Sequence, residues 1–272
     1  MLKRTIDLKD HYKVSGGSLD ILCMSDPFDG GNENWVRPAV IVVPGGAYYI
    51  VSRREGEPVA AEFFARGFQV CVLNYSCRPQ GAFYPEQLIE LACAVDYIKK
   101  NARELRVDPK EVFAVGFSAG GHLVGDLACE YGFIEKKAGY PLDAALTAAG
   151  LAYPVINAEP RTFDNLLFGY GEEEKAVLKD WLKLDERVDE NTPPVFIWTT
   201  AEDGLVPSQN SLDFARALAD HGVSYELHVY PKGRHGLSNA SPEVNAFTPA
   251  LGVASAWTSD MARFFRSFCK EK

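Results

Sequence analysis

A short apolar run that leads into a glycine-flanked serine and then into a helical pattern most restricts how this chain can fold. Residues 112–115 are continuously apolar, Gly116-Phe117-Ser118-Ala119-Gly120 follows them, and residues 121–128 continue with helical periodicity. This order predicts a buried strand, a sharp turn and a helix. Glycines keep side chains away from such a corner, which lifts the Ser118 hydroxyl clear of the sheet.

Short apolar runs and helical patterns alternate along the rest of the chain. The runs cover residues 39–43, 68–73 and 195–199 and, like residues 112–115, are rich in β-branched and aromatic residues, which favours parallel strands buried on both faces. Residues 225–230 show a strand pattern as well. Apolar positions share one helix face in three sets: Leu88, Leu91, Val95 and Ile98; Leu212, Ala215, Leu218 and Ala219; and Trp257, Met261, Phe264, Phe265 and Phe268. The alternation predicts an α/β fold, a doubly wound and mostly parallel sheet with helices on both faces.

The length of 272 residues suits one α/β domain, and we expect residues 1–272 to form it. Residues 153–194 break the rhythm, with two prolines near their start, an acidic cluster and a short helical pattern. In a doubly wound sheet the ligand crevice lies beyond the carboxyl ends of the strands. We therefore expect residues 153–194 to form an excursion over that crevice.

Charge and hydropathy exclude several classes of partner. The net charge is −9 and no basic cluster occurs, which argues against a nucleic-acid or anionic-membrane surface. No run approaches the roughly 18 apolar residues of a membrane span, and the first ten residues lack the apolar core of a signal peptide, so we expect a cytoplasmic protein. The six cysteines are scattered, with no histidine at ligand spacing, and predict no metal site.

A serine hydroxyl becomes a nucleophile when a base lies within hydrogen-bond reach and a carboxylate orients that base. His235 is our candidate base, because it follows the predicted strand 225–230 in a glycine-flanked loop. Asp203 is our candidate acid, because it follows the predicted strand 195–199 and precedes Gly204. Its neighbour Glu202 is the alternative, and the other of the two would serve as a turn or cap carboxylate. The remaining histidines are less well placed: His11, His122, His221 and His228.

An oxyanion that forms during attack on a carbonyl needs preorganised donors. Ala119 opens the helix after the serine and offers its N–H. Gly46 follows the strand 39–43 and offers a second N–H, because no bulky side chain blocks close approach there. Gly45 and Ala47 are further candidate donors, and a plain glycine turn is the alternative interpretation.

As a set, these motifs resemble the α/β-hydrolase fold, and within it the acetyl xylan esterase-like branch of carbohydrate acetylesterases, close to the hormone-sensitive-lipase-like esterases. The resemblance covers nearly the whole chain from about residue 15. The lipase-like relatives carry a histidine where this chain has Pro44, and often a glycine where it has Ala47. The matching segments are residues 43–48, 54–60, 73–76, 116–123, 203–207 and 235–236.

The resemblance implies a serine esterase without metal or organic cofactor that acts on small-molecule acyl esters, with acetyl groups on xylose-type sugars as candidates. It marks Ser118, Asp203 and His235 as a catalytic triad and Gly46 and Ala119 as the oxyanion hole.

Tyrosines near the predicted site are candidates to bind substrate. Tyr48 and Tyr49 could line an acyl pocket or stack on a sugar ring, with ordinary crevice lining as the alternative. Glu55 and Glu57 are candidates to orient the oxyanion loop, and a solvated helix start explains them equally well.

Two other functions stay open at this point. A prolyl-oligopeptidase-type peptidase shares the fold, and turnover of aminoacyl-proline amides rather than acetyl esters would indicate it. A hydrolase-like binding protein without activity would fail to react with a serine-directed phosphonate. The oligomeric state is not predicted.

Overall fold

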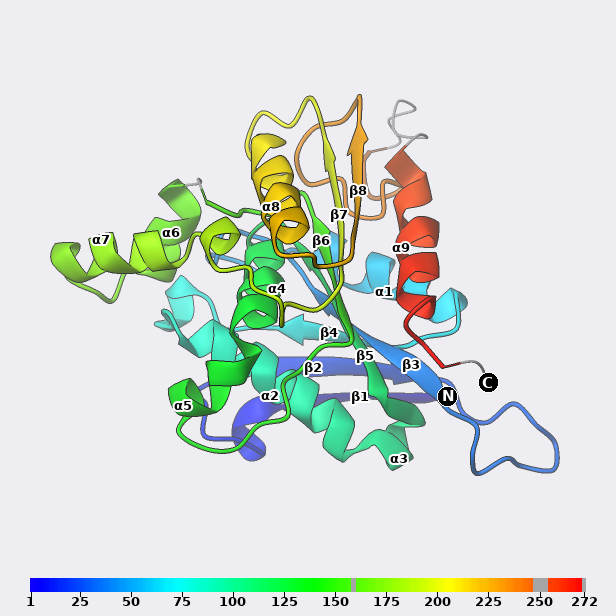
Figure 1. Ribbon diagram of the computed structural model, residues 1–272. Helices are drawn as coiled ribbons and strands as arrows, with labels where there is room; N and C mark the ends of the chain where they lie inside the picture. The colour runs from blue at the N-terminus through cyan, green and yellow to red at the C-terminus, as the bar shows by residue number, and fades with distance from the viewer. Residues whose placement is uncertain (158–159, 247–253, 271–272) are drawn as a thin grey trace.

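One mixed β-sheet forms the centre of the computed structural model, which describes residues 1–157, 160–246 and 254–270. Its eight described strands run in the order β1-β2-β4-β3-β5-β6-β7-β8 (Figure 1). Their bounds are β1 Leu2–Asp7, β2 Ser18–Cys23, β3 Arg37–Val43, β4 Gln69–Asn74, β5 Val107–Phe117, β6 Ala148–Ala152, β7 Val195–Thr200 and β8 Tyr225–Tyr230. The pairs β1–β2 and β2–β4 are antiparallel and the other pairs are parallel, so the predicted mostly parallel sheet is confirmed.

Helices cover both faces of this sheet (Figure 1). The side chains of α1 and α9 share a core with Val40 and Val42 of β3, whereas those of α2, α4 and α8 share a core with Ile41 and Val43. Because successive strand residues point to opposite faces, these are the two sides of one sheet. The helix bounds are α1 Glu57–Ala65, α2 Glu86–Lys100, α3 Ala102–Leu105, α4 Ala119–Glu130, α5 Ile134–Ala138, α6 Pro160–Leu166, α7 Glu172–Trp181, α8 Gln209–Asp220 and α9 Trp257–Arg266.

The apolar face of α9 docks as its pattern predicts, whereas the expected face of α8 is partly wrong. Phe265 of α9 stacks on Phe113 of β5 with ring centroids 4.6 Å apart. In α8, Leu212 is 42% exposed and Ala219 is also exposed, while Phe214 is buried. The face of α8 that packs on the sheet therefore includes the Phe214 ring and excludes Leu212 and Ala219.

The segment between β6 and β7 carries α6 and α7, which project from one side of the molecule in Figure 1. Asn165 of α6 donates a hydrogen bond from Nδ2 to the carbonyl of Ala47, 2.9 Å away. The backbone N–H of Tyr84 donates to the carbonyl of Leu166. These contacts join the segment to loops at the carboxyl ends of β3 and β4. Two residues of the expected excursion, 158 and 159, lie outside the described residues.

Across the part of the chain that the structure describes, none of the helices combines the length and apolar character needed to cross a membrane.

Candidate active site

The turn between β5 and α4 holds Ser118 in a left-handed conformation, with φ at +54°. Its N–H donates to the carbonyl of Ala152 at 3.0 Å, which ties the turn to the end of β6. A Cβ added at Gly116 would lie 2.1 Å from the Gly120 carbonyl oxygen, and one added at Gly120 would lie 2.2 Å from the Val43 oxygen. Both positions therefore require glycine, because the backbones of the turn, α4 and β3 meet there.

Ser118, His235 and Asp203 form one hydrogen-bonded chain. The Ser118 Oγ lies 2.8 Å from His235 Nε2, and His235 Nδ1 lies 2.7 Å from Asp203 Oδ2. The other carboxylate oxygen of Asp203 accepts from the N–H groups of Leu205 at 3.0 Å and Val206 at 2.9 Å. With Nδ1–H donating to Asp203, Nε2 is free to accept the serine proton.

The alternative acid, Glu202, lies outside this chain. Its side chain is 48% exposed and pairs with Lys232, and a hydrogen bond from that ammonium holds the pKa of the Glu202 carboxyl below its usual range. The Gly233 N–H also faces Glu202. Glu202 therefore lies against Lys232 and Gly233, at the start of the loop that carries His235, and its carboxylate does not reach the imidazole.

The four other histidines bond elsewhere. His122 lies one helical turn beyond the serine, but its ring is buried between the Tyr48 hydroxyl, 2.9 Å from Nδ1, and the Leu182 carbonyl, 3.1 Å from Nε2. Burial lowers the pKa of His122, which favours the neutral ring. His11 packs on Tyr97, His221 bonds the Ala217 carbonyl, and His228 bonds Glu226.

The loop after β3 leaves the N–H of Gly46 available to a ligand. The Gly45 N–H donates to Glu55 Oε2 at 2.9 Å, so Gly45 is already engaged. The Gly45 carbonyl accepts from Ser52 at 3.0 Å, and in a trans peptide the following N–H points the opposite way. The Gly46 N–H is thus directed away from Ser52 and has no partner among the described residues. The Ala119 N–H, in the first turn of α4, lacks an intrahelical partner as well.

A substitution at Gly46 should test this donor. Gly46 has φ at +129°, and a Cβ there would lie 2.0 Å from the Ile50 carbonyl oxygen. Gly46→Ala must therefore move the loop and its N–H, and we expect kcat to fall by about 10²–10³-fold, as for the loss of one oxyanion donor. Steady-state hydrolysis of 4-nitrophenyl acetate measures this. Gly30→Ala, where a Cβ meets nothing within 4 Å, is the control. A Gly46→Ala enzyme as fast as the control contradicts the assignment.

The two tyrosines expected to bind substrate differ in accessibility. Tyr48 is 1% exposed and its hydroxyl bonds His122, so it packs under the loop and presents no open ring to a ligand. Tyr49 is 49% exposed beside Ile50, which is 58% exposed. Of the two, Tyr49 is the one that is accessible from solvent. Tyr48 has φ at +55°, and this backbone turn directs its side chain inward.

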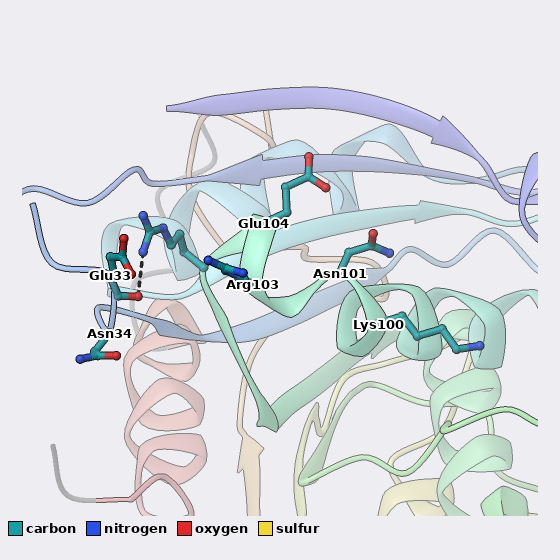
Figure 2. A pocket seen from close by; sticks show the side chains of 7 residues that line it. Glu33, Asn34, Lys100, Asn101, Arg103 and Glu104 are labelled. Carbon is teal, nitrogen blue, oxygen red and sulfur yellow. Dashed lines mark hydrogen bonds between the residues drawn. The ribbon is translucent and has the colours of Figure 1, made fainter.

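A hollow of about 780 Å³ lies far from these residues (Figure 2). Charged and amide side chains line it, and Arg106 Nη1 donates to the Glu33 carbonyl at 2.9 Å within it. Arg106 precedes the first residue of β5, whereas Ser118 follows the last, so the length of the strand, about 20 Å between Val107 and Gly116, separates them. The hollow is therefore no part of the triad's surroundings.

Comparison with known proteins assigns the family. The model of the prolyl oligopeptidase family matches residues 87–252, which is more than half of the chain and holds Ser118, Asp203 and His235. The chain belongs to the prolyl oligopeptidase family. This member also matches a second family model, BD-FAE, over residues 29–140, which include the loop at Gly46. Its fold is that of the α/β-hydrolase superfamily, so the predicted fold resemblance is confirmed.

Curated relatives of this prolyl oligopeptidase family member include carbohydrate-active enzymes. Endo-1,4-beta-xylanase B of Butyrivibrio fibrisolvens is 34% identical over 217 residues, which are 78% of this chain and 34% of that protein. An acetylxylan esterase of Xylanibacter ruminicola is 26% identical over 75% of this chain and 42% of that protein. The chain therefore spans about a third to two fifths of the length of these relatives.

Solved structures match this family member along its length. An acetyl ester-xyloside bifunctional hydrolase from Caldicellulosiruptor lactoaceticus superposes with a TM-score of 0.81 and 29% identity, covering 97% of this chain and 96% of that one. The carboxylesterase Cest-2923 of Lactobacillus plantarum gives a TM-score of 0.83 at 24% identity over 100% of both chains, which shows the shared fold. The relatives and neighbours named here are hydrolases.

Proposed function

We propose that the protein is a serine carboxylesterase that hydrolyses short-chain esters of small molecules, acetyl esters of xylose-type sugars above all. The observation that carries the proposal is the hydrogen-bonded chain Ser118–His235–Asp203 at the carboxyl ends of β5, β8 and β7. A serine nucleophile, an imidazole base and a buried carboxylate are the three groups that acyl transfer needs. Along the chain they occur as Ser118, Asp203 and His235, the order that α/β-hydrolases use.

In this mechanism the Ser118 oxygen attacks the ester carbonyl while His235 Nε2 takes the hydroxyl proton. The negative charge that develops on the carbonyl oxygen is stabilised by the N–H groups of Gly46 and Ala119. His235 then gives its proton to the leaving alcohol, which leaves an acyl group on Ser118. Water, deprotonated by His235, attacks that acyl group and restores the serine. Asp203 holds the required imidazole tautomer throughout.

The proposed sugar-ester substrate class rests on the activities of relatives and on one accessible aromatic ring. The acetylxylan esterase and the acetyl ester-xyloside hydrolase point to acetylated xylosides. Tyr49 lies two residues beyond Ala47 with half of its surface exposed, and an exposed aromatic face suits a sugar ring. We assign Tyr49 to the alcohol side of the ester on this basis.

We expect activity to fall as the acyl chain lengthens. Large buried side chains fill the interior around the catalytic turn: Tyr153 packs against both His235, at 5.0 Å between ring centroids, and Phe117, at 5.8 Å. From 4-nitrophenyl acetate to octanoate, kcat/KM should drop by about tenfold or more, since each misfit methylene costs discrimination of that order. Equal or rising rates toward octanoate would contradict a short-acyl site.

Peptide hydrolysis is the second candidate, because the matching family model is that of prolyl oligopeptidases. An aminoacyl-proline amide assayed beside 4-nitrophenyl acetate separates the two. Faster turnover of the amide at matched concentration would favour the peptidase, and turnover of the ester alone favours the esterase.

A further inference from the structure

Glu55 is a buried carboxylate that the catalytic steps above do not use. It ends a short helical turn, Arg53–Glu55, and is 5% exposed. Its Oε2 accepts from the Gly45 N–H at 2.9 Å, and its Oε1 accepts from the Tyr153 hydroxyl at 2.7 Å. A buried carboxylate is costly unless its oxygens are hydrogen-bonded, and both of these oxygens have donors.

One of these donors belongs to the oxyanion loop. A Cβ added at Gly45 would lie 2.7 Å from the Phe117 carbonyl oxygen and 3.0 Å from the Ser118 Cβ, so this loop rests directly on the nucleophile turn. Glu55 fixes the peptide before Gly45, and Ser52 fixes the peptide after it. The direction of the Gly46 N–H therefore depends on both bonds, and the Glu55 carboxylate supplies one of them.

The other donor leads to the loop that carries the base. Tyr153 is 1% exposed, its hydroxyl accepts from the Ser238 N–H at 2.9 Å, and its ring lies edge-on to the His235 imidazole. The neighbour of Glu55 repeats the link, since Arg54 Nη2 donates to the Gly236 carbonyl at 2.8 Å. Arg54 thus contacts the loop that follows β8 directly, and Glu55 reaches the same loop through Tyr153.

We infer that Glu55 is a positioning residue that holds the oxyanion loop and the His235 loop in register through Gly45 and Tyr153. The inference rests on the proposed acyl-transfer function. On this view, one carboxylate sets the distance between the oxyanion donor at Gly46 and the base His235. These two groups follow β3 and β8, which lie on opposite sides of β5 in the sheet. Losing that carboxylate should impair the transition state, where the oxyanion forms, more than substrate binding.

The test compares Glu55→Ala with Glu55→Gln, and uses Glu173→Ala as the control. Glu173 is an exposed glutamate in the first turn of α7. The glutamine carbonyl can still accept from Gly45, and its amide can donate to the Tyr153 oxygen, so the conservative variant should keep most activity. Each variant is measured for thermal midpoint, for kcat and KM on 4-nitrophenyl acetate, and for the rate at which an alkyl fluorophosphonate labels Ser118.

For Glu55→Ala we expect kcat to fall about 100-fold with KM within about threefold, and the labelling rate to fall with kcat. Glu55→Gln should recover at least about tenfold of that loss. A purely structural role would instead lower the thermal midpoint of both variants equally, with no rescue by glutamine, and would overturn the inference. Wild-type rates in a folded Glu55→Ala enzyme would overturn it too.

If Glu55→Ala does not fold, Tyr153→Phe replaces it, because the substitution removes the link to Ser238 and leaves Gly45 bonded to Glu55. We then expect kcat to fall about tenfold without a change in KM, and an unchanged kcat rejects the inference.

The labelling assay separates failure of this inference from failure of the proposed function. A labelled wild type that does not cleave acetate rejects the esterase and leaves the Glu55 comparison measurable; an unlabelled wild type rejects both.

Discussion

Ser118→Ala is expected to lower kcat/KM for 4-nitrophenyl acetate by about 10⁴-fold or more, down to the rate that the oxyanion donors alone sustain. The reason is the geometry of the turn: Ser118 Oγ lies 2.8 Å from His235 Nε2, and no proton transfer to that nitrogen can begin without the hydroxyl. The backbone at residue 118 is left-handed in any case, so alanine changes the chemistry with little added strain.

Ser224→Ala is the matched control for this prediction, because Ser224 is exposed and precedes β8. It should hydrolyse the ester at the wild-type rate. Covalent labelling by a fluorophosphonate should add one adduct to wild type and to Ser224→Ala and none to Ser118→Ala. Retained activity in the Ser118→Ala protein would show that another group performs the attack, and the proposed mechanism would be abandoned.

Asp203→Asn is expected to lower kcat by about 10⁴-fold, a loss close to that expected for Ser118→Ala. The carboxylate accepts three hydrogen bonds, one from His235 Nδ1 and two from the backbone at Leu205 and Val206. An asparagine that keeps its carbonyl on the backbone donors turns its amide toward His235. The imidazole then takes the other tautomer, with a proton on Nε2, and cannot accept from Ser118.

Glu202→Gln provides the control for Asp203→Asn at the adjacent position. Glu202 is half-exposed and pairs with Lys232, so the substitution should change kcat by less than about threefold. Steady-state kinetics of both variants, with circular dichroism to establish folding, distinguishes the two carboxylates. A larger loss at Glu202 than at Asp203 would reverse the assignment of the acid.

Much of the sheet was predictable because its central strands are buried on both faces. Strands β3, β4 and β7 have continuous apolar sequences, and periodicity identifies them. Strand β6 escaped prediction because its sequence, AAGLA, contains no β-branched or aromatic residue, although all five residues are buried. Small residues suit this strand because Met261 of α9 lies against it: a Cβ at Gly150 would be 2.5 Å from the Met261 sulfur.

The N-terminal hairpin was missed for a different reason. Strand β1 reads LKRTID, with alternate residues exposed at the edge of the sheet, and its polar content hides the period of two. Strand β2 alternates in the same way, with Leu19 and Ile21 buried. These residues form a strand because β2 pairs with β4, and that pairing joins segments some fifty residues apart in the sequence.

Within the site, sequence order was informative where a residue follows directly on a strand. Ser118 and Asp203 follow strands that the sequence predicts, and His235 follows a third; the structure brings the three together. Contacts that depend on tertiary packing were less accessible. The Tyr48 hydroxyl bonds His122 of α4, and Asn165 bonds the Ala47 carbonyl from within residues 153–194, where the sequence shows only a short helical pattern.

The base is carried by the loop after β8, and β8 is the outermost strand at its end of the described sheet. Outer strands are held by one neighbour, so they open more easily than the strands between two others. Fraying of this single strand from β7 would separate His235 from Ser118 while β3, β4 and β5 stay paired. Inactivation on heating should therefore precede loss of the fold, so the temperature range of activity is narrower than that of the folded state.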